Sequence, residues 1–288
     1  MILIVDSGST KSDWIAVDEN GTKLLEKIRT KGLNPAIISE KKLKKIITAN
    51  EDLNTNKDIV THVFFYGAGA GTEKARHVLK EVLKSIFVNA QIQVEEDTMA
   101  AVYATINHEN EAAVVCIMGT GSNCSYYDGQ NLHQKVISLG YSLMDDASGN
   151  YYGKQLIRDY YFNNMPENIH VAFETKYNLE ADFIKYNVYK QPSPNAYLAS
   201  FAEFMFLNKD SDYILNLIKD GIRVFTKNYI MQYSDKVKND PVHFAGSIAH
   251  FSQDQIREVA NEMGFTVGNV VRRPIEGLVT FHTKKLKA

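Results

Sequence analysis

The strongest constraint on the fold is a pattern that occurs twice along the chain. Residues 2–28 have the sequence ILIVDSGSTKSDWIAVDENGTKLLEKI, and residues 112–138 have the sequence AAVVCIMGTGSNCSYYDGQNLHQKVIS. In each, an apolar run leads into a polar turn that contains glycine, and a second apolar run returns to an Asn-Gly or Asp-Gly turn. This order predicts a duplicated unit that starts with an antiparallel hairpin.

The rest of the chain predicts helices and strands in both halves, which indicates a mixed α/β fold. We predict strands at residues 2–5, 13–18, 22–30, 60–66, 91–95 and 242–245. We predict helices at residues 40–49, 72–87, 98–106, 148–162, 196–208, 211–234, 252–263 and 274–286.

The composition excludes several classes of protein. The chain has 288 residues and a net charge of −2, so no basic excess indicates a nucleic-acid partner. No apolar run approaches the roughly 20 residues that a membrane span needs. Cys116 and Cys124 form no Cys-x-x-Cys pair, which argues against a zinc or iron–sulfur site. Without an evident signal peptide, we expect a soluble cytoplasmic protein with no membrane or nucleic-acid partner.

The two polar turns have the composition of phosphate-binding loops. Gly8 and Gly121 allow close approach of the backbone to a ligand. Hydroxyl and ammonium donors accompany them in both turns: Ser9, Thr10, Lys11, Thr120 and Ser122. Asp6 would repel a phosphate unless a cation lay between them, and a hydrated Mg²⁺ ion meets that need. We therefore predict that the two turns bind the phosphates of one nucleotide with Mg²⁺, across a central cleft between two lobes.

Other phosphate motifs fit less well. The chain contains no Gly-x-x-x-x-Gly-Lys-Ser/Thr sequence, which excludes a P-loop. The glycines of residues 67–71 lie between a predicted strand and helix, but their spacing departs from that of a dinucleotide-binding fingerprint.

Taken together, these residues resemble a known superfamily. IVDSGSTKSDWIAVD and IMGTGSNCSYYDG resemble the two phosphate motifs of the actin/hexokinase/Hsp70 superfamily, and FAGSIAHF resembles its adenosine segment. The set as a whole resembles the N-acetylglucosamine kinase branch of the BadF/BadG/BcrA/BcrD ATPase family. This likeness implies a duplicated ribonuclease H-like (actin-like ATPase) fold of two lobes with a central cleft. It also implies lobes at residues 1–108 and 109–274, with a helix at 275–288 that returns to the first lobe.

The resemblance implies ATP-dependent phosphoryl transfer to the 6-hydroxyl of an amino sugar. Asp97 matches the catalytic aspartate, which would accept the proton of the sugar hydroxyl. From the residues alone, Asp97 is also a good N-cap for the helix at 98–106. Family members often form dimers, so a homodimer is a possible assembly.

Other positions follow from the same resemblance. Thr10 and Thr120 match phosphate-binding residues, and Gly246 with Ser247 matches the adenosine segment. The residues that match or accompany the sugar ligands are Asn34, Gly71, Ser122, Asn123, Gly140 and Asp145. Without the resemblance, Asn34 is a turn residue, Asp145 a carboxylate near a helix start, and Gly246-Ser247 a strand-to-helix loop.

The sequence departs from the family where a sugar would bind. The family motif Gly-Asp-Glu-Gly-Ser-Gly is replaced by Met144-Asp145-Asp146-Ala147-Ser148-Gly149. The sugar therefore stays open among N-acetylglucosamine, glucosamine, N-acetylmuramic acid and other hexoses. Two alternatives have another function: an ATPase activator of a radical dehydratase, and a non-catalytic sensor of sugar or ATP.

Overall fold

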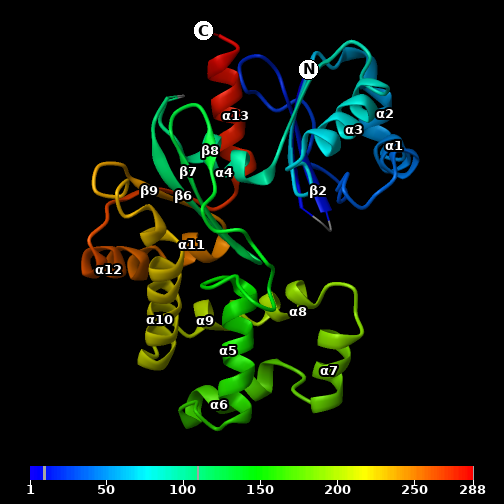
Figure 1. Ribbon diagram of the computed structural model, residues 1–288. Coiled ribbons are helices and arrows are strands. Elements are labelled where there is room, and N and C mark those ends of the chain that lie inside the picture. Colours follow the sequence, from blue (N-terminus) through cyan, green and yellow to red (C-terminus); the bar gives the residue numbers. More distant parts are fainter. Residues whose placement is uncertain (9–10, 109, 288) are drawn as a thin grey trace. The chain divides into compact units, whose positions relative to one another are not determined.

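The computed structural model describes residues 1–8, 11–108 and 110–287. The chain forms two compact units (Figure 1). The first unit contains residues 1–105 and 273–288, and the second contains residues 106–272. The C-terminal segment therefore returns to the unit in which the chain begins.

The first unit is built on a five-stranded mixed sheet with the order β3-β2-β1-β4-β5. Strands β1, β2 and β3 pair in antiparallel fashion, whereas β4 and β5 continue the sheet parallel to β1. Its strands are β1 (Ile2–Ser7), β2 (Lys11–Val17), β3 (Ile28–Lys31), β4 (His62–Gly67) and β5 (Gln91–Glu95). Its helices are α1 (Glu40–Thr48), α2 (Glu51–Thr55), a 3₁₀ turn (Lys57–Ile59), α3 (Glu73–Lys84), α4 (Asp97–Thr105) and α13 (Pro274–Lys285).

Both faces of this sheet are covered, because its strands alternate between two cores. Leu3 and Val5 of β1 pack with Leu43, Ile47 and Leu79 of α1 and α3. Ile2 and Ile4 face the other way and pack with Ala100 of α4 and with Ile275 and Leu278 of α13. Helix α13, red in Figure 1, thus completes the core of the first unit beside α4.

The second unit repeats the same sheet topology. Its five strands have the order β10-β9-β6-β7-β8, with an antiparallel β6–β7–β8 part and a parallel β6–β9–β10 part. The strands are β6 (Ala113–Met118), β7 (Ser122–Tyr127), β8 (Leu132–His133), β9 (Val242–Ala245) and β10 (Val267–Val271). Because β6–β7 corresponds to β1–β2 in order and direction, the predicted duplicated fold is confirmed.

The helices of the second unit are more numerous and pack around a single large core. Buried residues of β6, α5 and α10 meet in this core, including Val114, Leu156 and Phe225. The helices are α5 (Gly149–Tyr161), α6 (Glu167–Lys176), α7 (Ala181–Tyr189), α8 (Pro194–Ser200), α9 (Glu203–Leu207), α10 (Asp212–Asn228), a 3₁₀ turn (Ile230–Tyr233), α11 (Ser247–Phe251) and α12 (Gln253–Met263).

Three local predictions were wrong. The helix predicted at 196–208 is divided into α8 and α9 by a turn at Phe201 and Ala202. The strand predicted at residues 22–30 is limited to Ile28–Lys31, with one isolated bridge between Val17 and Lys23. The Asp18 carboxylate accepts the N–H groups of Asn20 and Thr22, which holds a turn, and the following residues up to Lys27 are mostly exposed. The helix predicted at 211–234 ends at Asn228 and continues as a 3₁₀ turn.

Candidate active site

Two acidic residues come together at the carboxyl ends of the parallel strands in the first unit. Asp6 of β1 lies opposite Tyr66 of β4, and Tyr66 lies opposite Glu95 of β5. Asp97 follows two residues after Glu95, as the first residue of α4. Strand ends of this kind are a common place for binding sites in α/β folds.

The carboxyl groups of Asp6 and Asp97 are electrostatically coupled. Burial, and then the charges of Asp97 and Asp13, raise the pKa of Asp6 from 3.8 to about 6, against smaller opposing effects of Lys27 and Lys11. Burial of the carboxyl group and the Glu96 charge also raise the pKa of Asp97, although the residue retains exposed surface. The nearby backbone N–H of Thr98 opposes this rise in the pKa of Asp97, which is the first residue of α4.

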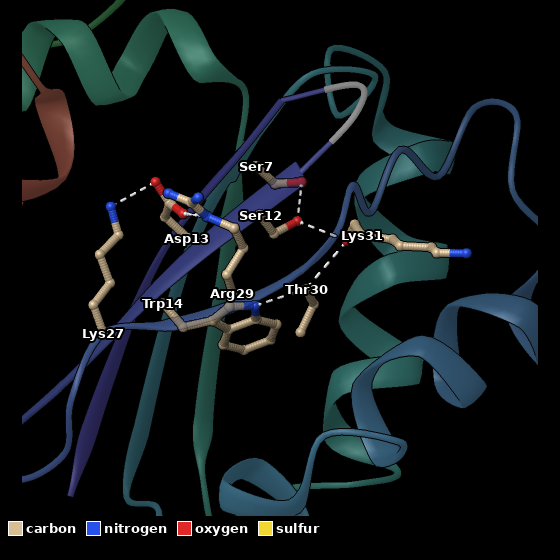
Figure 2. Close-up of polar contacts among 8 residues, drawn as sticks. All are labelled: Ser7, Ser12, Asp13, Trp14, Lys27, Arg29, Thr30 and Lys31. Atoms are coloured by element: carbon tan, nitrogen blue, oxygen red, sulfur yellow. Dashed lines mark hydrogen bonds and ion pairs between the residues drawn. The ribbon is translucent and has the colours of Figure 1, made fainter.

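Asp13 behaves in the opposite way although it lies directly across from Asp6 on β2. Lys27 Nζ lies 2.6 Å and Arg29 Nε 2.8 Å from its carboxylate oxygens (Figure 2). Burial by itself would raise the pKa of Asp13, but the hydrogen bonds and charges of Arg29 and Lys27 lower it below 3.8. Asp13 is therefore neutralised within the fold, and Asp6 is not.

The base of the first polar turn is tied to the segment before Asn34. Ser12 Oγ lies 2.7 Å from Ser7 Oγ, and the Leu33 N–H donates to Ser7 Oγ at 3.0 Å (Figure 2 shows the two serines). The Gly8 N–H donates to Lys11 O at 2.9 Å, which closes the turn. Ser9 and Thr10, two predicted phosphate ligands, lie outside the described residues.

The glycine loop after β4 brings the next predicted residues to this edge. A Cβ atom on Gly69 would lie 1.9 Å from Asn34 Oδ1, so Asn34 packs directly over the loop. Asn34 Oδ1 also accepts the Ala36 N–H, which is the turn role expected from its sequence context. A Cβ on Gly71 would lie 3.3 Å from Glu96 Oε2, which sets Gly71 beside Glu96 and Asp97.

In the second unit, the turn after β6 rests on the start of helix α5. The N–H groups of Gly149 and Asn150 donate to Gly119 O and Thr120 O at 2.7 and 3.1 Å, and Asn150 Nδ2 donates to Thr120 O at 2.7 Å. The Thr120 residue itself is exposed. The helix N-cap is Ser148, whose side chain accepts the Tyr151 N–H.

Asp145 is held against this turn. Its carboxylate accepts the Ser122 N–H at 3.3 Å and Asn150 Nδ2 at 2.9 Å, and its own N–H lies 3.2 Å from the Tyr229 hydroxyl. A Cβ on Gly121 would lie 2.8 Å from Asp145 Oδ2, so glycine is required for this approach. The structure therefore brings together Thr120, Gly121, Ser122 and Asp145.

The segment around Gly246 and Ser247, which resembles an adenosine-binding segment, lies next to the same turn. Ile117 pairs with Ala245 in the parallel β6–β9 ladder, so the residues after both strands are neighbours. Gly246 has φ 119°, and a Cβ there would lie 2.3 Å from Met118 O. Ser247, which begins α11, is exposed beside it.

The remaining predicted ligands are less closely joined. The Asn123 side chain accepts Gln134 Nε2 at 3.0 Å, and Gly140 begins the turn that leads through Met144 to Asp145. The sequence reasoning missed Asn150, which bonds both Thr120 and Asp145. The only feature of the sequence that pointed to Asn150 was its position directly after Ser148-Gly149, the last two residues of the segment that corresponds to the family motif.

The donor set at Asp6 suits Mg²⁺ better than a metal that needs a full protein cage. Among the residues that the structure describes, no cluster of three His, Cys, Asp or Glu side chains could hold a metal ion. Mg²⁺ is usually bound by one or two carboxylates, with substrate phosphates and water completing its shell. Asp6, with Asp97 nearby, fits that pattern.

Two further findings concern the alternative classes. Cys116 and Cys124 are buried, pair across β6 and β7, and place their Sγ atoms 3.6 Å apart. In the described part of the chain, every helix is too short or too polar to cross a membrane.

Comparisons with known proteins bear on the fold and the family of the chain. The model of the BadF/BadG/BcrA/BcrD ATPase family matches residues 5–278. The solved structure of a "putative N-acetylglucosamine kinase" from Porphyromonas gingivalis is similar at 32% identity and a TM-score of 0.89, covering 99% of both chains. A comparison with curated proteins gives no match.

More distant structures share the fold alone. A "putative N-acetylglucosamine kinase" from Chromobacterium violaceum has 13% identity and a TM-score of 0.70, covering 97% of this chain and 98% of its own. A ROK family glucokinase from Streptomyces griseus, solved with glucose and AMPPNP, has 16% identity and a TM-score of 0.58 over 97% of each chain.

Proposed function

Since the chain belongs to the BadF/BadG/BcrA/BcrD ATPase family, we propose that it is an ATP-dependent sugar kinase. It transfers the γ-phosphoryl group of ATP to the 6-hydroxyl of an amino sugar, with N-acetylglucosamine as the favoured substrate. The observation that carries this proposal is the coupled pair of carboxyl groups, Asp6 and Asp97, at the ends of parallel strands in an ATPase fold.

Asp97 is the general base of the proposed reaction. A sugar hydroxyl is a poor nucleophile, and a positioned carboxylate that takes its proton contributes about 10²–10⁴ in rate. The raised pKa of Asp97 makes its carboxylate a stronger proton acceptor than an ordinary aspartate.

Asp6 is the proposed metal-binding carboxylate. When bound, Mg²⁺ supplies charge neutralisation for the phosphates during transfer. Asp6 would hold it through the carboxylate oxygens or through bound water. The raised pKa of Asp6 supports this assignment, because a nearby cation would favour its ionised form.

The nucleotide contacts are assigned to three segments. Gly8, Ser9, Thr10 and Lys11 in the first turn, and Thr120 with Gly121 in the second, bind the phosphates. Gly246 and Ser247 contact the adenosine. Support comes from the close packing of Gly246 against the residue before the second turn, and from the exposed Thr120 and Ser247.

The proposed sugar ligands are Asn34, Gly71, Ser122, Asn123, Gly140 and Asp145. Ser122 supports the set, because its Oγ is buried and has no hydrogen-bond partner among the described residues. A sugar hydroxyl is the type of group that would satisfy it. N-acetylglucosamine is favoured because the Porphyromonas gingivalis structure, named for that activity, is similar over nearly the whole chain.

The two alternatives have less support. An activator of a radical dehydratase needs surface cysteines for a cluster shared between subunits, whereas Cys116 and Cys124 are buried and face each other. A non-catalytic sensor needs no base, and gives no reason for a carboxyl group such as Asp97 to be kept beside Asp6.

A coupled ADP-release assay tests the proposal. Amino sugars and hexoses are screened with ATP, with and without Mg²⁺, and the Asp97→Asn variant is compared with the parent protein. We expect Mg²⁺-dependent turnover that falls by about 10²-fold or more in Asp97→Asn, with ATP binding retained. Asp212→Asn, the same change at the exposed first residue of α10, is the control. Turnover of Asp97→Asn at the parent rate would refute the role of Asp97 as general base. Binding of sugar or ATP without turnover by the parent protein would favour the non-catalytic sensor.

A further inference from the structure

A groove in the first unit lies between the edge strand β3 and helix α1. Its volume is about 570 Å³, within the range of small-molecule sites. Thr30 and Lys31 line the side of the strand, and Lys42, Lys45, Ile46 and Ala49 line the side of the helix. None of these residues belongs to the proposed kinase site.

The spacing of residues along α1 explains which of its side chains line the groove. Leu43 and Ile47 of α1 are fully buried in the core of the unit. Lys42, Lys45, Ile46 and Ala49 follow the i, i+3, i+4, i+7 spacing, so they form a separate stripe along the groove. This stripe combines two ammonium groups with an apolar strip formed by Ile46 and Ala49.

The positive charge of the groove is not neutralised by the protein. Lys31, Lys42 and Lys45 form no ion pair with any described residue, and no carboxylate lines the groove. Arg29 also lines the groove, but it pairs with Asp13, as does the neighbouring Lys27 (Figure 2). Figure 2 also shows Lys31 extending away from that cluster. Three like charges on one groove repel one another and leave the groove electropositive.

We propose that this groove binds a small organic phosphate. Its anionic groups would contact Lys31, Lys42 and Lys45, and its carbon skeleton would lie against Ile46 and Ala49. Asn50 adds a donor, because its Oδ1 is occupied by the Leu53 N–H while its Nδ2 remains available among the described contacts. Lysine ammonium groups are common ligands of phosphate.

The charge and size of the groove favour this ligand over a polymer. The whole chain has a net charge of −2, so the positive charge is local to the groove. An extended nucleic acid needs a basic track along many phosphates. A ligand with about three negative charges and a small skeleton matches three ammonium groups in a groove of this volume.

The groove also shares strand β3 with the candidate active site. Ser12 Oγ lies 3.3 Å from Lys31 O and 2.7 Å from Ser7 Oγ (Figure 2). Ser7 directly follows Asp6 in β1. Lys31 is also followed within three residues by Asn34. The binding proposal does not depend on the kinase proposal, because its test measures binding and not turnover.

The test is a calorimetric titration with 3-phosphoglycerate, which is neither a nucleotide nor a sugar and carries about three negative charges. The matched variants are Lys42→Glu/Lys45→Glu and Lys41→Glu/Lys44→Glu. Both pairs lie on α1 and change the net charge equally, but Lys41 and Lys44 do not line the groove. We expect binding that weakens about tenfold or more in the first pair and changes by less than about threefold in the second.

Each other outcome is decisive. Absence of binding at about 10 mM ligand, or equal losses in both pairs, would overturn the proposal, the latter because it would indicate long-range attraction. Inorganic phosphate that binds as tightly as 3-phosphoglycerate would overturn the role of the apolar strip. Circular dichroism of each variant verifies that α1 still folds.

Discussion

Replacement of Asp6 by asparagine should stabilise the ligand-free protein at neutral pH. Asp6 is a partly exposed strand residue whose carboxyl group is crowded by protein atoms and by Asp97. Asparagine has nearly the same shape and no charge. The change therefore removes the repulsion between the carboxylates while it retains the packing at the end of β1.

The magnitude follows from the pKa of Asp6, which rises from 3.8 to about 6 on folding. A carboxyl group with a raised pKa binds its proton more tightly in the folded state, so the free energy of unfolding falls as the pH rises from about 4 to above 6. The full rise corresponds to about 3 kcal/mol at pH 7, at about 1.4 kcal/mol for each pH unit. Because Asp6 retains some exposure, this value is an upper bound.

Urea unfolding of both proteins between pH 4 and 7.5 measures the effect. The stability difference in favour of Asp6→Asn should grow with pH and level off above pH about 7, at no more than about 3 kcal/mol. Asp13→Asn is the control, because Asp13 lies opposite Asp6 but is paired with Lys27 and Arg29. Loss of the Asp13 carboxylate should destabilise the protein at neutral pH, because Lys27 and Arg29 would lose their partner. A difference for Asp6→Asn that does not change with pH, or one of the opposite sign, would refute the reasoning.

Two further substitutions test how the second unit is held together. Asn150→Ala removes the side-chain bonds from Nδ2 to Thr120 O and Asp145 Oδ2 but keeps the backbone bond to Thr120 O. It should lower the free energy of unfolding by about 1–3 kcal/mol and raise the KM for the sugar more than it lowers kcat; an unchanged unfolding curve in urea would contradict it. Gly246→Ala introduces a Cβ only 2.3 Å from Met118 O, at a φ of 119°. This change should destabilise the protein by roughly 2 kcal/mol or more, measured by thermal unfolding. A melting temperature equal to that of the parent protein would contradict this prediction and show that the end of the strand moves freely.

The hairpins could be predicted from the sequence because they depend on local pattern. Ile2–Val5 and Trp14–Val17 are apolar runs on either side of a polar turn, and they form β1 and β2 in register. The position of Asp97 could be predicted in the same way, because a strand ends and a helix begins at this point of the sequence. These features need only neighbouring residues, whereas the parallel pairing of β1 with β4 and of β6 with β9 joins strands far apart in the sequence.

Other features depend on contacts between distant residues. Residues 22–27 have the composition of a strand, yet the Asp18 turn directs them onto the surface. Asp145 and Ala147 have φ values of 70° and 54°, which side chains other than glycine rarely adopt. Asn150 reaches Thr120 and Asp145 only because this segment folds back on the second turn. No local pattern in the sequence specifies that return.

The contrast between Asp6 and Asp13 bears on function as well as on stability. The two residues face each other across β1 and β2, and the fold supplies Asp13 with two cations at 2.6 and 2.8 Å. Asp6 receives only weak effects from Lys27 and Lys11, and it lies beside a second acid, Asp97. A fold selected for stability alone would gain from a neutral residue at position 6. We propose that the balancing positive charge comes from a divalent cation bound with the phosphates of ATP. Millimolar Mg²⁺ with ATP should then reduce the stability advantage of Asp6→Asn, whereas Mg²⁺ should leave the effect of Asp13→Asn unchanged.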